Sequence, residues 1–299
     1  MQKFGRVYRI DFEIGNLEKL GAYDRPIPLD SLSISYPLTA QFNISRTMSS
    51  AVNTAFVQIY GLSQLTREKI YKDRYDATRY IKMDIYAGYQ DSMSLVFSGY
   101  IKECQSTRKS GATEFITQID AWDGGLGMYL GEDNNTYPSG TAYQQILADL
   151  STNMFGVNVG KISNNLPIEK PLRSITFNGK TYDDLRTYTK DNLFIDNGTI
   201  NFIDTERDVI EGNIGLINVD SGLLGTPERR NTNIIVEMIF EPSIVLGQQL
   251  ELESQQLPYL NQVYKVLGVS HDGIISGAKS GSMITRLELF VGTQTFRSV

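Results

Sequence analysis

A stretch that could bind phosphate occurs at Asn178-Gly179-Lys180-Thr181, between an apolar run and a helical pattern. A phosphate loop needs a first glycine five residues before Gly179, but Ser174 stands there, and the residues between are β-branched or aromatic. The Asn-Gly pair is typical of a turn, and Thr181 followed three residues later by Asp184 is typical of a helix start. We therefore expect a turn and a capped helix here, and no nucleotide site.

A glycine-rich stretch, Trp122-Asp123-Gly124-Gly125-Leu126-Gly127, has the composition of a dinucleotide-binding turn. That motif needs a following helix, a parallel sheet and an acidic residue about 20 positions further on. The next residues, Met128-Tyr129-Leu130-Gly131, are too few for such a helix. We expect a strand end followed by a loop.

Side-chain oxygens that suit calcium occur at Asp133-Asn134-Asn135. The glycine and the terminal glutamate of a calcium loop are absent at the required offsets, so we expect a polar surface loop. The 34 acidic residues include carboxylate pairs of the kind that hydrolyse glycosides, but nothing in the sequence marks one pair over another.

The residue types of a catalytic triad are adjacent at Ser270-His271-Asp272. Neighbouring side chains of a strand point to opposite faces, so these three cannot adopt triad geometry. Cys104 lies in a strand pattern and is expected to be a small core or edge residue. With one Cys and one His, the chain excludes an internal disulfide framework, a cysteine-based zinc cluster and any site that needs two histidines. We expect no catalytic residue, no cofactor and no metal site.

The composition points to a β-rich globular protein. At roughly 150 residues per domain, 299 residues suggest about two domains. The 17 Tyr, 13 Phe and 26 Gly favour strands and tight turns, while a net charge of −6 argues against a broad DNA-binding surface. No apolar run approaches the ~20 residues that span a bilayer, so we expect a soluble protein made in the cytoplasm.

The hydrophobic pattern alternates with period two over most of the chain, which predicts strands. Ser63 is a good cap for a helix that carries Leu65 and Ile70, and Asn197-Gly198 predicts a tight type I′ turn. Two further helices are expected at Thr141–Asn153 and Thr181–Lys190. Strands are expected at Tyr8–Ile14, Leu38–Ile44, Thr54–Tyr60, Tyr80–Tyr89, Ser94–Glu103, Glu114–Trp122, Leu172–Phe177, Leu193–Ile195, Thr199–Ile203, Ile234–Phe240, Gln249–Glu253, Gln262–Ser270 and Ser282–Phe290, with turns at Arg108–Gly111, Asp272-Gly273 and Gly277–Gly281.

The end of the chain repeats the strand order of its beginning. Strands Ile81–Ala87, Val96–Ser106 and Glu114–Ala121 correspond in order and spacing to Gln249–Glu253, Gln262–Ser270 and Ser282–Phe290, without residue identity. This pattern fits a duplicated β-domain and equally a pair of ordinary β-meanders.

Several segments in order resemble the baseplate hub, or tail hub, proteins of contractile-tailed bacteriophages, which are related to the hub portion of type VI secretion spikes. The resemblance covers most of residues 50–290. It rests on a strand ending in IYGLS at 59–63, a strand ending in AGY at 87–89, VFSGYI at 96–101 and AWDG at 121–124. It continues through NGKTYDDLRTYTKDNLFIDNGTINFI at 178–203, SGLLGTP at 221–227, VEMIFEPSIVLGQQLELES at 236–254 and YKVLGVSHDG at 264–273.

The resemblance implies a mainly β fold with a small α+β insertion and two tube-protein-like antiparallel β-barrel domains. The expected parts are a first barrel at 1–127, a small α/β segment at 128–205 and a second barrel at 206–299, where 206–231 could instead complete the first barrel. Family members are homotrimers whose six barrels form a pseudo-six-fold ring between the six-fold tail tube and the three-fold central spike. DNA would pass through as cargo, and the spike and any hydrolase are expected to be separate chains.

On this interpretation the protein is a structural component of the virion, located in the tail baseplate and produced in the host cytoplasm. It is not an enzyme, and its partners are other copies of itself, the tail tube or its initiator, the spike and other baseplate proteins. The candidate contact residues lie in two expected loops: Arg108, Lys109, Gly111, Asp272, Gly273 and Lys279. The sequence leaves two alternatives open, namely a tail tube or tube-adaptor protein with one barrel per chain, and a cell-wall or glycan hydrolase of the tail.

Overall fold

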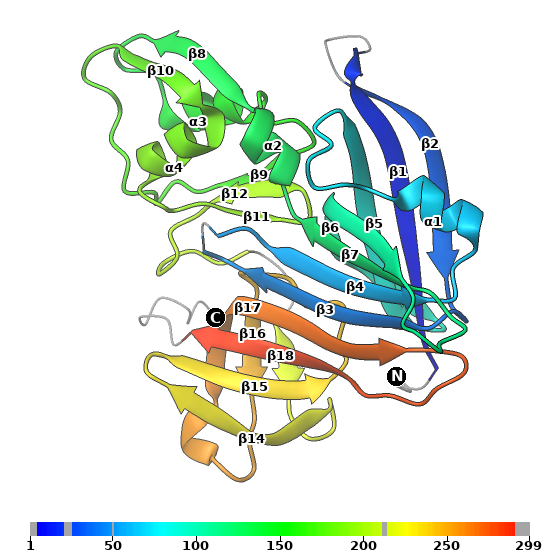
Figure 1. Cartoon of the computed structure of the whole chain (residues 1–299). Coiled ribbons are helices and arrows are strands. Elements are labelled where there is room, and N and C mark those ends of the chain that lie inside the picture. The colour runs from blue at the N-terminus through cyan, green and yellow to red at the C-terminus, as the bar shows by residue number, and fades with distance from the viewer. Residues whose placement is uncertain (1–4, 21–25, 50, 211–213, 291–299) are drawn as a thin grey trace.

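The computed structural model describes residues 5–20, 26–49, 51–210 and 214–290. One long, mostly antiparallel sheet runs through two parts of the molecule, which we call the N-lobe and the C-lobe, and a small α/β insertion stands beside them (Figure 1). The expected mainly β fold with a small α+β insertion is thus confirmed. The expected ends of the first and second barrel, residues 1 and 299, lie outside the described residues, and the domain boundaries stay a prediction.

The N-lobe is a curled seven-stranded sheet with the order β3-β4-β7-β6-β5-β1-β2. The alternating residues of its strands fill one core, and a short helix, α1, covers part of it with the buried Ile70. Ser63 caps α1 as expected, because its hydroxyl accepts a hydrogen bond from the Thr66 amide. The elements are β1 (Arg6–Leu20), β2 (Pro26–Ser35), β3 (Ala40–Thr47), β4 (Thr54–Tyr60), α1 (Gln64–Ile70), β5 (Arg79–Tyr89), β6 (Ser92–Thr107) and β7 (Ile116–Trp122).

The insertion has its own apolar core beneath three helices. Asn197 and Gly198 both have positive φ and form the expected turn of a hairpin. The elements are α2 (Gly125–Leu130), β8 (Glu132–Tyr137), α3 (Tyr143–Ser151), β9 (Asn158–Ile162), β10 (Ile175–Lys180), α4 (Thr181–Thr189), β11 (Phe194–Asp196) and β12 (Thr199–Phe202).

The C-lobe sheet has the order β14-β15-β18-β17, and β16 and β13 continue it along the first half of β17. Its core is separate from that of the N-lobe, although Phe240, Ile275 and Met283 pack into the N-lobe core. The elements are β13 (Gly215–Ile217), β14 (Leu223–Arg230), β15 (Asn233–Ile239), β16 (Gln249–Leu252), a 3-10 turn at Pro258–Leu260, β17 (Gln262–Ile275) and β18 (Met283–Phe290).

The two lobes repeat one ladder. The order β3-β4-β7-β6-β5-β1 of the N-lobe corresponds strand by strand to β14-β15-β18-β17-β16-β13 of the C-lobe. A bulge falls at the same place in both, because one extra residue, Lys102 in β6 or Leu267 in β17, interrupts the pairing with the next strand. The structure therefore favours the duplicated domain over two ordinary meanders. One pairing differs, since β1 runs antiparallel to β5 while β13 runs parallel to β16.

A single ladder, which we call the joint, connects the lobes. β3 of the N-lobe pairs with the second half of β17 from Gly268 to Ile275, beyond the point where β16 ends (Figure 1). Each lobe is a curved sheet around a core, and no ladder between described residues closes either one into a complete barrel.

Five local expectations are wrong. The glycine-rich stretch after β7 does not continue as a loop, because Gly125–Leu130 forms the short helix α2. Asp272-Gly273 is not a turn but part of β17, because pairing on both sides extends the strand to Ile275. Asp133-Asn134-Asn135 is not a loop but lies in β8, opposite the expected turn Asn178-Gly179, which lies in β10. Thr181 is not the cap of α4 but its first residue, and Lys180 is at the cap position.

Candidate interaction surface

The residues whose types suggested a catalytic or phosphate-binding site are buried or bonded to other parts of the protein. His271 is fully buried, and its Nδ1 lies 3.0 Å from the Thr285 hydroxyl, while Ser270 and Asp272 lie on the other face of β17. The Lys180 ammonium bonds to Glu132 and to the Tyr129 carbonyl and does not face an anion loop. Burial raises the pKa of the Cys104 thiol to about 12, which keeps it protonated and unreactive at neutral pH. Within the described residues, no group of three or more His, Cys, Asp or Glu side chains is arranged to hold a metal ion.

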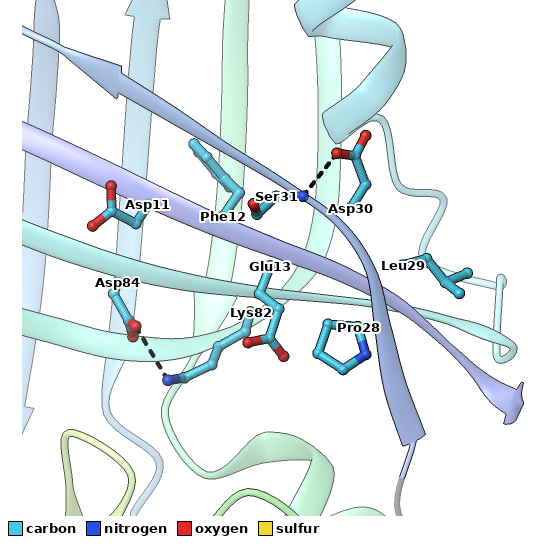
Figure 2. A pocket seen from close by; sticks show the side chains of 9 residues that line it. All are labelled: Asp11, Phe12, Glu13, Pro28, Leu29, Asp30, Ser31, Lys82 and Asp84. Atoms are coloured by element: carbon cyan, nitrogen blue, oxygen red, sulfur yellow. Dashed lines mark hydrogen bonds and ion pairs between the residues drawn. The ribbon is translucent and has the colours of Figure 1, made fainter. Parts of the chain in front are cut away.

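The acidic hollow between β1, β2 and β5 is one place where two carboxylates could cooperate (Figure 2). It contains four acids, but Asp11 accepts from Ser33, and Lys82 pairs with Asp84 at 3.1 Å and lies opposite Glu13. The hydrogen bond from Lys69 lowers the pKa of Asp30, whereas a general acid for glycoside hydrolysis needs a raised pKa. The hollow therefore has paired acids rather than an acid–base couple.

A buried polar cluster fixes the insertion against the N-lobe. Asp123, directly after β7, accepts hydrogen bonds from the amides of Asn197 and Gly198 at 2.6 and 2.8 Å. The Asn197 side-chain oxygen in turn accepts from the Ser98 amide of β6 at 3.0 Å. Burial raises the pKa of Asp123 to about 7 against these stabilising bonds. The tight turn and the glycine-rich stretch were both visible in the sequence, but nothing there indicated that they meet.

A buried ion pair holds the insertion and both lobes together. Arg46 of β3 is 2 % exposed and bonds to Asp196 of β11 at 3.1 Å and to the Ile244 carbonyl of the C-lobe at 2.9 Å. Asn53 adds a bond from its amide to the Ile195 carbonyl at 2.7 Å. One arginine therefore sets the relative position of three parts of the molecule.

The two expected contact loops lie at one end of the sheet. The guanidinium of Arg108, in the β6–β7 loop, is 5.2 Å from the centre of the Phe115 ring, and the Phe115 carbonyl accepts from the Gly61 amide directly after β4. Lys279, in the β17–β18 loop, reaches within 5.8 Å of the ring of Tyr60, the last residue of β4. Arg108 and Lys279 therefore flank the same pair of aromatic residues.

The remaining candidates divide between loop and strand. Lys109 and Gly111 are exposed at the tip of the β6–β7 loop. Asp272 accepts from the Asn43 side chain at 2.7 Å within the joint. Gly273 has φ +145°, and a Cβ there would meet the Ser282 carbonyl at 2.1 Å, so it is needed for the backbone and not for a contact loop. The part that these six residues play at an interface stays a prediction.

The fold matches solved tail proteins over nearly their whole length. The tail protein of Neisseria meningitidis MC58 aligns with a TM-score of 0.58 at 9% identity, over 96% of this chain and 97% of that one. The 43 kDa tail protein of prophage MuSo2 from Shewanella oneidensis aligns with a TM-score of 0.57 at 9% identity, over 93% and 96%. The E. coli type VI secretion protein c3393, described as similar to the T4 tail proteins gp27 and gp5, aligns with 0.54 at 10% identity, over 87% and 74%.

These matches define the fold as that of phage tail proteins and their type VI secretion relatives. The model of the baseplate hub gp41 family matches residues 25–273, and the chain belongs to that family. It is therefore a structural protein of a bacteriophage baseplate. A search of curated proteins finds no match. Among the described residues, no helix is both long and apolar enough to cross a membrane.

Proposed function

We propose that this baseplate protein forms a homotrimeric hub. Each chain supplies two lobes with one strand order, so three chains arrange six related lobes in a pseudo-six-fold ring. The repeated ladder is the observation that carries the proposal, because a ring with two kinds of lobe has six-fold shape and three-fold symmetry at once. It can meet a six-fold tube on one side and a three-fold spike on the other.

The proposed partners are the tail tube or its initiator, the central spike and other baseplate proteins. Structures of a Francisella PdpA–VgrG complex share this fold with a TM-score of 0.56 at 10% identity, over 95% of this chain and 53% of that one, which supports a spike as neighbour. The end that carries Arg108, Lys109 and Lys279 is the proposed contact face. The net charge of −6 suits a ring through which DNA passes without adsorbing.

The proposed division of labour gives 1–127 and 206–299 to the ring and 128–205 to its periphery. A tube or tube-adaptor protein needs one lobe per chain and a six-fold ring, so the repeat within one chain favours the hub. A hydrolase would need two converging carboxylates with one raised pKa, and the acidic hollow of Figure 2 offers paired ones.

The test is the native mass of the purified protein by light scattering coupled to gel filtration. Three copies of the 33.6 kDa chain give about 101 kDa. A hexamer would favour a tail tube or tube-adaptor protein instead, and a monomer at high concentration would contradict the hub proposal. Electron microscopy of the same peak then distinguishes a closed ring of six lobes from a compact trimer.

A further inference from the structure

The joint shows how one lobe of this repeat docks on another. β17 has a bulge at Leu267, and from Gly268 onward its edge pairs with β3. The paired side chains are complementary on the outer face, where Asn43 donates to Asp272 at 2.7 Å. The joint thus places the β3 strand of one lobe on the β17 edge of the other.

The counterpart of that edge in the N-lobe is open. β6 has the equivalent bulge at Lys102, and the following residues Glu103–Thr107, which we call the β6 edge, match Gly268–Asp272. Among the described residues, the β6 edge has one backbone partner, Lys72, which exchanges hydrogen bonds with Cys104. Lys72 occupies the place that Arg46 takes opposite Val269 in the joint.

A groove runs beside the open part of the β6 edge. It has a volume of about 610 Å³ and lies between α1 and the end of β6. Gln64, Arg67 and Tyr71 line one side, and Gln105 and Ser106 line the other. The amide and carbonyl of Cys104 point toward Lys72. Because these groups point to the same side of a strand at every second residue, the amide and carbonyl of Ser106 also point to this side, into the groove.

The counterpart of β3 is also open. β14 is the last strand at the C-lobe end of the sheet, and no described strand pairs with its outer edge. Its residues Glu228–Arg230, which we call the β14 edge, pair inward with β15 around the two-residue turn Asn231-Thr232. Since Arg230 and Asn233 flank that turn as a hydrogen-bonded pair, the amide and carbonyl of Arg229 point outward.

We infer that the β14 edge of one copy pairs with the β6 edge of a second copy, and so repeats the joint between chains. Each chain then has one strand to give and one edge to receive it, which is a head-to-tail contact that closes into a ring. The joint sets the register: Arg230 lies opposite Gln105, Arg229 opposite Ser106 and Glu228 opposite Thr107. This inference rests on the proposed trimer and names the surfaces that build it.

The side chains at this contact can form a hydrogen bond like that of the joint, with donor and acceptor exchanged between the two strands. In the joint, Asn43 of the inserted strand donates and Asp272 of the receiving edge accepts. At the corresponding positions, Glu228 of the inserted strand can accept and the Thr107 hydroxyl of the receiving edge can donate. Pro227 ends the pairing because it has no amide, so the contact is shorter than the joint.

Disulfide trapping tests the register. In the double variant Gln105→Cys with Arg230→Cys, we expect covalent dimers and trimers on a non-reducing gel that disappear with reductant, because opposed strand residues lie within disulfide range. Ser45→Cys with Ser270→Cys is the matched control inside the joint, and it should form a bond within one chain. Thr54→Cys with Arg230→Cys, which places the first cysteine on exposed β4, should stay uncrosslinked.

The possible results distinguish a failure of the inferred contact from a failure of the proposed trimer. If the native mass is trimeric but the 105/230 pair stays monomeric on the gel while the 45/270 control oxidises, the inferred contact is wrong and the hub proposal stands. If the native mass is monomeric at high concentration, both fail. Native Cys104 does not interfere, because burial raises the pKa of its thiol to about 12.

A proline substitution tests the backbone bond itself. Arg229→Pro removes the outward amide and leaves the inward pairing of Glu228 and Arg230, whereas Arg229→Ala keeps the amide and removes only the side chain. We expect the proline variant to dissociate at a protein concentration at least tenfold higher than the alanine variant, with the same circular dichroism for both. Equal dissociation of the two variants would overturn the inference.

Discussion

The N-lobe and the C-lobe share one strand order. They differ in what pairs with β6 after its bulge at Lys102 and with β17 after its bulge at Leu267. In the C-lobe that edge receives eight residues of β3, and Arg46 sits opposite Val269. In the N-lobe the edge is met by Lys72 alone among the described residues, opposite Cys104. The comparison teaches that a duplicated domain docks its copies by reusing one edge, so the occupied lobe describes the contact that the open lobe can make.

The largest expected difference between the lobes concerns these two cations. Arg46→Ala leaves Asp196 buried without its partner, and we expect a loss of about 3–5 kcal/mol in the free energy of unfolding. Lys72→Ala removes an ammonium whose bonds to described residues go to two carbonyl oxygens, those of Asp76 and Arg79, and should cost about 1–3 kcal/mol. Urea unfolding measures both.

Arg286→Ala is the control for this pair of variants. Arg286 bonds to Glu237 on the surface, where an ion pair contributes below about 1 kcal/mol. Equal losses for Arg46→Ala and Lys72→Ala would contradict the view that the joint and the N-lobe edge differ in strength.

The two lobes should respond differently to pH because of the position that lies two residues after Val269 in β17 and two residues after Cys104 in β6. That position holds His271 in the C-lobe and Ser106 in the N-lobe. Burial, with a smaller effect from Arg46, lowers the pKa of His271 from 6.5 to about 3, so stability is lost as the pH falls from 6.5 toward 3. His271→Asn removes this loss. We expect its stability relative to the native protein to improve by about 2 kcal/mol between pH 8 and pH 5.

A second group acts in the opposite direction and must be held constant in this measurement. Because the pKa of Asp123 is raised to about 7 from 3.8, its contribution is present at low pH and is lost as the pH rises through 7. Both proteins in the comparison keep Asp123, so its effect cancels in the difference. Ser106→Ala should show no such pH dependence, and an unchanged difference for His271→Asn would refute the prediction.

A smaller difference is expected for the equivalent buried threonines. Thr285 bonds to the His271 ring and accepts from the Glu241 amide, whereas Thr117 bonds to the Ser106 hydroxyl. Thr285→Val should cost about 2 kcal/mol because the buried His271 ring and the partly buried Glu241 amide both lose a partner, and Thr117→Val about 1 kcal/mol because Ser106 is partly exposed to water. The ratio of the two losses from thermal unfolding gives the result, and a larger loss for Thr117→Val would be inconsistent with the structure.

The smallest effects are expected in the two loops that join the equivalent hairpins. Lys109 and Lys279 are exposed, and their replacement by alanine should change stability by less than about 0.5 kcal/mol in either lobe. A loss of the proposed trimer in either variant with unchanged thermal stability would assign that loop to an interface. A clear drop in melting temperature would instead give it a structural part.

Local patterns predicted most of the strands, and tertiary pairing explains the failures. Alternation located β4 and β5 because one face of each is buried along its whole length. β2 was missed because its prolines look like a break, although an edge strand tolerates them. Asp272-Gly273 looks like a turn, but strands on both sides hold it extended.

The interaction surface was predictable only in part. The resemblance gave the duplicated architecture, and the expected hairpins put Arg108 and Lys279 in loops at one end of the sheet. The joint was not visible, because its partners β3 and β17 are more than 200 residues apart and have no sequence feature that marks them as partners. Arg46 was missed for the same reason, since its acidic partner Asp196 is far away in the chain.

The joint also dictates the order in which the chain can fold during synthesis. Residues 40–47 pair with residues 268–275, which are made more than 200 residues later, and the N-lobe core lacks Phe240, Ile275 and Met283 until those residues have been made. A nascent N-lobe therefore has an unpaired edge and an incomplete core until the partner strand has been made, although domains made early normally fold first. Pairing between strands so far apart in the sequence gives a high contact order, which is typical of slow folding.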